Sequence, residues 1–113
     1  MVGVYVTTVT TIQIIGGKYH KMEEASIEKR LKNEVEKIGG KSLKFVSPGT
    51  TGVPDRIVLL PHGKLIFVEL KATGKKMSPI QEYRAKEYRA LGFDVRCINS
   101  IEKIKELIQE VII

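Results

Sequence analysis

Two apolar runs joined by a short turn constrain the fold of this chain more than any other feature of its sequence. The runs are RIVLL at residues 56–60 and LIFVELK at residues 65–71, and the turn PHGK between them carries a proline and a glycine. This pattern predicts an antiparallel hairpin, in which the side chains of the second arm alternate between two faces. Both faces are apolar, so we expect the hairpin to lie centrally in a sheet and to be covered on two sides.

Three helical patterns and two further strands surround the hairpin. Residues 23–38 carry an apolar stripe at helical spacing and end at two glycines, and residues 101–111 carry another. Residues 78–92 predict a helix with Ser78 as N-cap, Pro79 in the first turn and Gly92 after its end. LKFVS at residues 43–47 and DVRCI at residues 94–98 predict strands. The order helix, three strands, helix, strand, helix predicts an α/β fold with a mixed sheet between helices.

Chain length and N-terminal composition indicate one domain preceded by an extension. A chain of 113 residues suits a single compact domain, which we assign to residues 22–113. The first 21 residues contain no acid and are rich in Thr, Val and Ile, which favours strands. Met22 stands directly before the first helical pattern. Residues 1–21 are therefore predicted to be a strand-like extension, and the sequence assigns them no role.

The charge balance indicates the kind of partner, and the cysteine content indicates the cellular compartment. The formal net charge of +6 favours an anionic partner, of which nucleic acid is the commonest. The single cysteine, Cys97, excludes an intrachain disulfide and is predicted to be a small core residue in a reducing compartment. No apolar run approaches the roughly 18 residues of a membrane span, and the opening residues lack a secretory signal. We therefore expect a cytoplasmic protein that makes no membrane contact.

Two carboxylates and a lysine interrupt the apolar hairpin. Asp55 precedes the first arm and Glu69 lies near the end of the second, so a short turn brings position 55 close to position 69 or 70. Lys71 shares a face with Glu69, because residues two apart on a strand point to the same side. Carboxylate oxygens suit magnesium or manganese, and a lysine can contact a phosphate oxygen or an attacking water. The alternatives are a turn residue at Asp55 and a solvated strand end at Glu69 and Lys71.

A longer stretch of sequence resembles a nuclease family. Pro54-Asp55 and Glu69-Leu70-Lys71 match the PD-(D/E)xK nuclease signature, and KFVSPGTTGVPDRIVLLPHGKLIFVELKATGKKMSPIQ at residues 44–81 more closely resembles the VRR-Nuc (virus-type replication-repair nuclease) family. The resemblance is to its short, phage-encoded stand-alone form, and it leaves residues 1–21 uncovered. It implies a restriction-endonuclease-like fold and a DNA endonuclease activity that depends on magnesium, with manganese as a substitute.

The resemblance also implies a metal site. The ligands it implies on the hairpin are Asp55, Glu69 and the backbone carbonyl of Leu70, and Lys71 is expected to act beside them in catalysis. Family members also carry a glutamate on the first helix that reaches the metal, for which Glu24 and Glu28 are the candidates here. The spacing to the closing glycine in related junction resolvases favours Glu28, whereas the opening pattern E-x-x-I-E matches both.

Further residues are expected to contact the substrate. The glutamine after the motif falls on Gln81, which is expected to orient the active site or contact the phosphate. Ser78 and Gln81 also have the spacing of a capping box, and the two roles are compatible. The residues expected to contact nucleic acid are Lys44, Ser47, Arg56, Lys75 and Lys76. For the last two of these, a solvated basic loop is the alternative.

The resemblance finally implies a symmetric homodimer that resolves four-way DNA junctions. Resolution of a four-way (Holliday) DNA junction requires two symmetric cuts, and a two-fold homodimer supplies paired active sites. The alternatives are a nuclease of flaps or other branched DNA, a non-catalytic nucleic-acid-binding module that kept the fold, and an interaction protein with an incidental motif. The intact set of two acids and a lysine argues against the last two, because a binding module gains little from acids that face phosphate.

Overall fold

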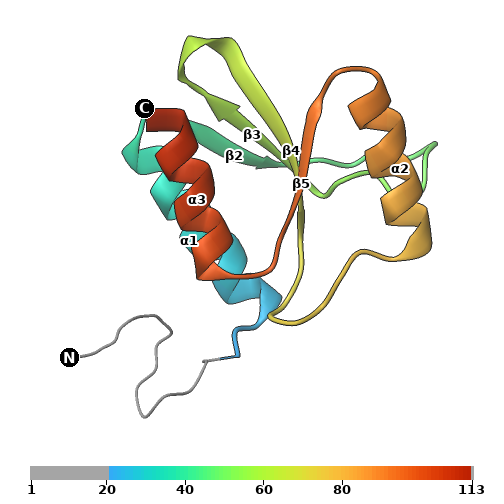
Figure 1. The fold of residues 1–113 in the computed structure, drawn as a ribbon, viewed down its shortest axis with the longest axis horizontal. Coiled ribbons are helices and arrows are strands. Elements are labelled where there is room, and N and C mark those ends of the chain that lie inside the picture. The colour runs from blue at the N-terminus through green and yellow to red at the C-terminus, as the bar shows by residue number, and fades with distance from the viewer. Residues whose placement is uncertain (1–20, 113) are drawn as a thin grey trace.

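A computed structural model describes residues 21–112, and within them a four-stranded mixed sheet lies between helices (Figure 1). The helices are α1 (Glu24–Lys37), α2 (Pro79–Ala90) and α3 (Ile101–Ile112). The strands are β2 (Lys41–Lys44), β3 (Arg56–Leu60), β4 (Lys64–Leu70) and β5 (Asp94–Ile98), and a 3-10 turn, Pro61–Gly63, joins β3 to β4. The predicted fold class and order of elements are confirmed. The extension predicted for residues 1–21 lies outside the described residues, apart from Lys21.

The predicted hairpin of β3 and β4 forms the centre of the sheet. The strand order is β2-β3-β4-β5, in which β4 and β5 are parallel and the other neighbours are antiparallel. Arg56, the first residue of β3, lies opposite Val68 of β4. This register places Asp55, one residue before β3, beside the end of β4.

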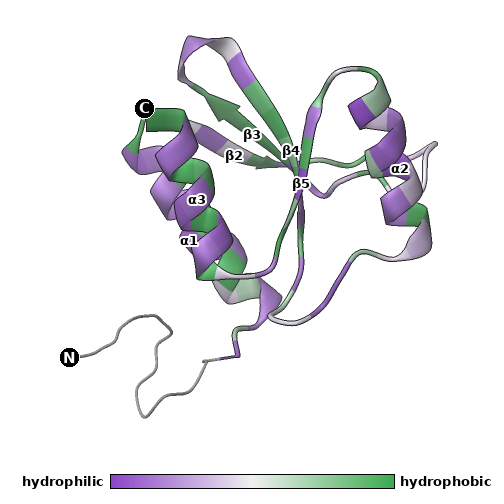
Figure 2. Ribbon diagram, in the orientation of Figure 1, coloured by the Kyte–Doolittle hydropathy of each residue, from purple (hydrophilic) through white to green (hydrophobic). Residues whose placement is uncertain are grey.

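One face of the sheet is covered by α1 and α3, which lie side by side (Figure 1). Figure 2 shows hydrophobic residues alternating with hydrophilic ones along both helices. The buried core on this face comprises Ile27, Leu31, Val35, Val58, Leu60, Ile66, Val68, Leu70, Ile98, Ile104 and Leu107. The remaining residues of the two predicted stripes, which are Ile38, Ile101, Ile108 and Val111, are partly buried against it. No helix in the described part of the chain is long and apolar enough to cross a membrane.

The other face of the sheet is covered only in part, by α2. Phe67 of β4 lies there in a cluster of aromatic rings, with centroid separations of 5.1 to 5.8 Å, whose other members are Phe45, Tyr88 and Phe93. Toward the edge strand, Leu43 and Leu59 remain 46% and 37% exposed. Leu43 lies opposite Ile57 and Leu59 opposite Leu65, so these four residues form one contiguous surface, the open sheet face. The predicted cover of the hairpin is therefore complete on one face only, because the short helix α2 lies against β5.

The edge strand β2 begins and ends earlier than predicted. It spans Lys41–Lys44 instead of residues 43–47. Gly40 explains the shift, because a Cβ at this position would lie 2.5 Å from the carbonyl oxygen of Leu59. The chain therefore already lies against β3 at Gly40, and pairing with β3 begins at the next residue, Lys41. Phe45 still donates its N–H to the carbonyl of Asp55 at 2.8 Å, and the chain then leaves the sheet.

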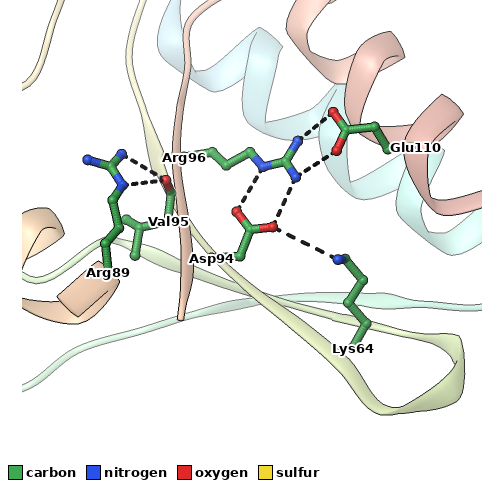
Figure 3. A network of polar contacts seen from close by, with 6 residues as sticks. All are labelled: Lys64, Arg89, Asp94, Val95, Arg96 and Glu110. Atoms are coloured by element: carbon green, nitrogen blue, oxygen red, sulfur yellow. Dashed lines mark hydrogen bonds and ion pairs between the residues drawn. The ribbon is translucent and has the colours of Figure 1, made fainter. Parts of the chain in front are cut away.

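A network of ion pairs fixes the end of the sheet opposite to Asp55 (Figure 3). Arg96 of β5 donates hydrogen bonds to Asp94 and to Glu110 of α3 over distances of 2.8 to 2.9 Å. Lys64 Nζ lies 3.9 Å from the same aspartate. The hydrogen bonds from Arg96 hold the pKa of Asp94 below its ordinary value. The network joins α3 to β5 and β4 and so keeps the covered face of the sheet closed.

Candidate active site

Asp55 and the end of β4 converge at one edge of the sheet, as the hairpin pattern predicts. Asp55 Oδ1 accepts a hydrogen bond from the backbone N–H of Leu70 at 3.1 Å. Lys71 follows β4 and donates its N–H to the carbonyl of Ile98 at 3.1 Å, which continues the pairing with β5 beyond Leu70. These hydrogen bonds of Leu70 and Lys71 fix the backbone next to Glu69. The carboxylates of Glu69 and Asp55 are therefore held on the same edge of the sheet.

The loop that leads into Asp55 is fixed against α2. Gly52 has a φ of +84°, and a Cβ there would lie 2.9 Å from the carbonyl oxygen of Ile80, so this contact requires glycine. Arg84 Nε donates a hydrogen bond to the carbonyl of Thr51 at 2.8 Å. These two contacts hold the loop on the first turns of α2 and fix the direction from which Asp55 enters the site.

Glu69 is a buried carboxylate at the centre of this edge, with only 4% of its surface exposed. Its Oε2 accepts a hydrogen bond from Gln81 Nε2 at 3.0 Å and lies 3.6 Å from Lys71 Nζ. Its Oε1 is buried and has no hydrogen-bond partner within residues 21–112. A buried carboxylate oxygen without a partner is costly. The position of this oxygen therefore favours a site for a cation over a purely structural carboxylate.

Gln81 connects Glu69 to the start of α2. Its side-chain Oε1 accepts the N–H of Ser78 at 2.9 Å, and its own N–H donates to Ser78 Oγ at 3.3 Å, which completes a capping box. Its Nε2 is then free to donate to Glu69. The capping role expected for Gln81 is therefore confirmed, and its hydrogen bond to Glu69 is compatible with the second expected role, orientation of the site.

The electrostatics of the edge disfavour two ionised carboxylates. Burial raises the pKa of Asp55, and the hydrogen bond from Leu70 offsets part of this effect. Burial and then the negative charge of Asp55 raise the pKa of Glu69 to about 7, against the opposing charge of Lys71. The charge of Glu24 raises the pKa of both Asp55 and Glu69. A divalent cation at this edge would relieve this repulsion.

The two glutamates of α1 have different surroundings. Glu28 Oε2 accepts a hydrogen bond from Arg56 Nη1 at 2.7 Å, whereas the charge of Glu24 acts on Asp55 and Glu69. Both glutamates therefore stay candidates for the helix-one ligand that the sequence predicts, and the ion pair with Arg56 distinguishes Glu28, which the spacing favoured, from Glu24. The spacing alone could not reveal that Arg56, 28 positions further along the chain, engages Glu28.

Arg56, an expected nucleic-acid contact, makes several hydrogen bonds inside the protein. It is 7% exposed, and its Nε and Nη2 donate to the side-chain and backbone oxygens of Ser42 at 3.2 and 3.1 Å. With Glu28 on Nη1, three nitrogens of the guanidinium have partners inside the protein. The expectation that Arg56 contacts nucleic acid stays a prediction, and in this structure the side chain turns inward and ties β2 and β3 to α1.

The remaining predicted contact residues lie around the same edge. Lys44 is exposed at the end of β2, and Ser47 is partly buried in a turn in which its carbonyl accepts the N–H of Thr50 at 3.0 Å. Lys75 and Lys76 are exposed in the connection between β4 and α2. Cys97, predicted in the core, is partly buried on β5 directly opposite Glu69. Burial raises the pKa of its thiol, which favours the neutral form.

The residues at this edge fit a magnesium ion. Asp55 and Glu69 supply hard carboxylate oxygens, and one oxygen of Glu69 lacks any partner in the described residues. Between residues 21 and 112, no three His, Cys, Asp or Glu side chains form a group that could hold a metal ion by themselves. Magnesium does not require such a group, because one or two carboxylates commonly hold it while waters and phosphates complete its octahedral shell. The donors suit magnesium or manganese shared with a phosphate-bearing ligand.

The substitution Glu69→Gln is expected to stabilise the metal-free protein at pH 8. The folded-state pKa of about 7 exceeds the ordinary value of 4.5, so the folded state binds the proton more tightly and stability falls as the pH rises between these values. Above pH 7 the ionised carboxylate costs on the order of 1 to 3 kcal/mol, which a neutral amide of the same shape avoids. Urea unfolding in EDTA should show this gain at pH 8 and none at pH 4. Equal gains at both values would contradict the prediction.

Two contacts of the site carry no signal in the sequence that pattern reasoning uses. The Arg84 side chain donates to the backbone carbonyl of Thr51, and Gly52 packs against the backbone of Ile80, so both contacts engage backbone atoms that any residue possesses. The one available signal is Gly52 itself, within a loop already rich in turn formers. A requirement for glycine can be inferred there, but the residue against which it packs cannot.

Known proteins resemble this chain in both sequence and structure. No family model matches it. Over 79 residues the chain is 54% identical to "Putative nuclease p44" of Acyrthosiphon pisum secondary endosymbiont phage 1, an alignment that covers 70% of this chain and 85% of that protein. A solved structure described as a VRR_NUC domain is similar with a TM-score of 0.74 and 31% sequence identity, and the match covers 78% of this chain and 96% of that one.

Proposed function

Because the chain belongs to the VRR-Nuc family of nucleases, we propose that it is a metal-dependent endonuclease that hydrolyses phosphodiester bonds in DNA. The observation that carries the proposal is the buried Oε1 of Glu69, which has no hydrogen-bond partner among the described residues. Asp55 raises the pKa of this carboxyl further. Buried like charges are unfavourable unless a cation or a proton compensates them. A divalent cation shared with the substrate supplies that compensation.

The residues of this edge have distinct roles in the proposed reaction. Asp55, Glu69, the backbone carbonyl of Leu70 and Glu24 would hold magnesium, for which manganese would substitute. A bound divalent cation polarises the scissile phosphate and lowers the pKa of a water. Hydrolysis forms a bond from the water oxygen to phosphorus and breaks the bond from phosphorus to the leaving sugar oxygen, which takes up a proton.

Lys71 and Gln81, which both contact Glu69 Oε2, would assist these groups. Lys71 Nζ, which lies 3.6 Å from Glu69, would orient the attacking water or contact a phosphate oxygen. Gln81 holds the Glu69 carboxylate in one orientation through its Nε2, and the capping box in turn holds Gln81. Pre-set orientation of this kind lowers the reorganisation that the reaction requires.

We further propose that the protein acts as a symmetric homodimer on four-way DNA junctions. The described chain carries one such edge, whereas resolution of a junction needs two cuts, and two-fold symmetry supplies the second. The open sheet face, with Leu43 and Leu59 exposed on neighbouring strands, supports a self-packing interface, because two sheets can bury such faces against each other. The net charge of +6 per chain suits a substrate with phosphates on several arms.

The double variant Leu43→Lys/Leu59→Lys is expected to convert a dimer to a monomer in light scattering, because charges placed on the open sheet face oppose its burial. Junction resolution should then fall by about tenfold or more, since paired cuts need paired sites. Ile112→Lys, an exposed apolar position on α3 at 57% exposure, is the matched control and should remain dimeric. A wild-type protein that is monomeric at assay concentrations and prefers flaps would refute the resolvase proposal and leave the nuclease chemistry intact.

A single assay separates the alternatives. Purified protein is incubated with labelled linear, flapped and four-way DNA, with and without magnesium. Cleavage mapped on all four strands of the junction distinguishes a resolvase from a nuclease of flaps or other branched DNA. Binding of DNA without cleavage of any substrate would favour the non-catalytic binding module.

A further inference from the structure

The connection between β4 and α2 is clamped to the start of α1. Thr73 donates its N–H to the carbonyl of Met22 at 3.1 Å, and Met22 donates its N–H to Thr73 Oγ1 at 3.0 Å. The two residues are 51 positions apart, and Met22 also packs against the core. Figure 1 shows this connection passing beside the N-terminal end of α1. The clamp therefore holds the chain that follows Lys71 in one place.

A second clamp ties the same connection to the junction of β5 and α3. Asn99 Nδ2 donates to the carbonyl of Lys75 at 2.8 Å, and Lys75 donates its own N–H to the carbonyl of Ala72 at 3.0 Å. The turn from Ala72 to Lys75 is therefore held by one hydrogen bond within the turn and by a second one from Asn99. An exposed loop with this number of backbone contacts loses little further freedom when it binds a ligand.

Four exposed lysines lie on the segments that the clamps bring together, and we call them the lysine ridge: Lys21, Lys75, Lys76 and Lys103. Lys103 stands in the first turn of α3, where its N–H donates to Ser100 Oγ at 3.2 Å. Three exposed acids, Glu23, Glu24 and Glu102, lie on the same segments, so the four lysines outnumber them by one. The ridge begins at the edge of the sheet that carries Lys71, and its net positive charge faces solvent beside the candidate active site.

We propose that the lysine ridge binds the phosphates of a DNA arm and holds that arm against the catalytic edge, with Thr73 and Asn99 as positioning residues. This inference rests on the proposed function, because the ligand is the same DNA. Ammonium groups on a clamped backbone contact phosphates by displacing condensed counterions, so each contact adds to the salt dependence of binding. The ridge therefore adds Lys21 and Lys103 to the phosphate contacts expected of Lys75 and Lys76. It also explains why the loop is held by two clamps.

The test compares the salt dependence of DNA binding between variants. Binding of the full chain to labelled four-way DNA is measured in EDTA over a range of salt concentrations. Lys75→Gln/Lys76→Gln should reduce the slope of log K against log salt by about 2 and weaken binding about tenfold at moderate salt. Lys21→Gln should reduce the slope by about 1. The matched control, Lys32→Gln/Lys37→Gln, removes two exposed lysines from the outer part of α1 and should leave the slope unchanged.

Variants of the clamps test the positioning roles without changing any charge. Thr73→Val and Asn99→Ala should each weaken binding about threefold while the slope stays at its wild-type value, because all phosphate contacts remain but are less well ordered. Thr73→Ser, which keeps the hydroxyl acceptor for Met22, should restore wild-type binding. Wild-type affinity in both clamp variants would overturn the positioning roles.

The outcomes for the ridge and for the nuclease are separate. Lysine variants that keep the full wild-type slope would overturn the ridge, even if the wild-type protein cleaves DNA with magnesium. If the wild-type protein cut no DNA and the lysine variants still reduced the salt-dependence slope of DNA binding, the proposed function would be overturned. The ridge would remain in place. Circular dichroism of each variant confirms that the comparison is made between folded proteins.

Discussion

Asp55→Asn is expected to lower the rate of DNA cleavage by at least about two orders of magnitude, because it removes a metal-binding carboxylate from the reaction centre. The asparagine side-chain oxygen can still accept the N–H of Leu70, which Asp55 accepts at 3.1 Å, so the fold should be retained. Single-turnover cleavage of labelled four-way DNA with magnesium measures the rate. Thermal unfolding measured in parallel checks that the variant is folded.

Glu69→Gln and Lys71→Met are expected to give losses of similar size for different reasons. Glu69→Gln keeps an acceptor for Gln81 but removes the charge that a cation requires, and Lys71→Met removes the ammonium 3.6 Å from that carboxylate. Both variants preserve the packing of β4. If Asp55→Asn or Glu69→Gln cleaved DNA at the wild-type rate, this edge would be excluded as the active site. The proposed reaction gives both carboxylates one role, which is to bind the metal.

The two glutamates of α1 provide a matched pair of controls. Glu24→Gln should slow cleavage, because the charge of Glu24 acts on Asp55 and Glu69. Glu28→Gln should leave the rate close to wild type and lower stability by about 1 kcal/mol, because Arg56 loses an ionised partner that it contacts at 2.7 Å. The reverse result would restore Glu28 as the helix-one ligand.

The convergence of Asp55 on the end of β4 could be predicted from sequence because it depends on local geometry. A short turn fixes the register of a hairpin, and alternation along β4 fixes the face that Glu69 and Lys71 share. The observed pairing of Arg56 with Val68 follows from the same constraint. The caps of α2 and the apolar stripes of α1 and α3 are local in the same sense, so their prediction also succeeded.

The features that the sequence could not supply all depend on partners that are distant along the chain. Arg56 stands beside Asp55 and carries a charge that suits DNA, but Ser42 and Glu28 draw it into the interior. The beginning of β2 depends on how closely Gly40 approaches Leu59. No periodicity encodes these contacts, because each arises when two elements pack and the polar groups between them must be satisfied.

Magnesium and manganese are expected to support cleavage, whereas calcium should support DNA binding without efficient cleavage. The donors at the edge are oxygens, with one oxygen of Glu69 buried and without a partner in residues 21–112. Bound to such donors, magnesium or manganese would hold a water in an ordered position for attack on the phosphate. Calcium has a larger and looser shell and positions the water poorly. The measurement is the single-turnover rate with each metal at saturating concentration, alongside binding of the same DNA.

Removal of the metal is expected to abolish turnover reversibly. The reaction should stop in EDTA and resume when magnesium is restored in excess, because hydrogen bonds from Leu70 and Gln81 hold Asp55 and Glu69 in place. Restored activity should follow the added magnesium with no lag for refolding. Asp55→Asn prepared in the same way serves as the control for contaminating nuclease. Undiminished cleavage in EDTA, with this control inactive, would show that the carboxylates act without a metal, and the buried, unpartnered oxygen of Glu69 would then need another explanation.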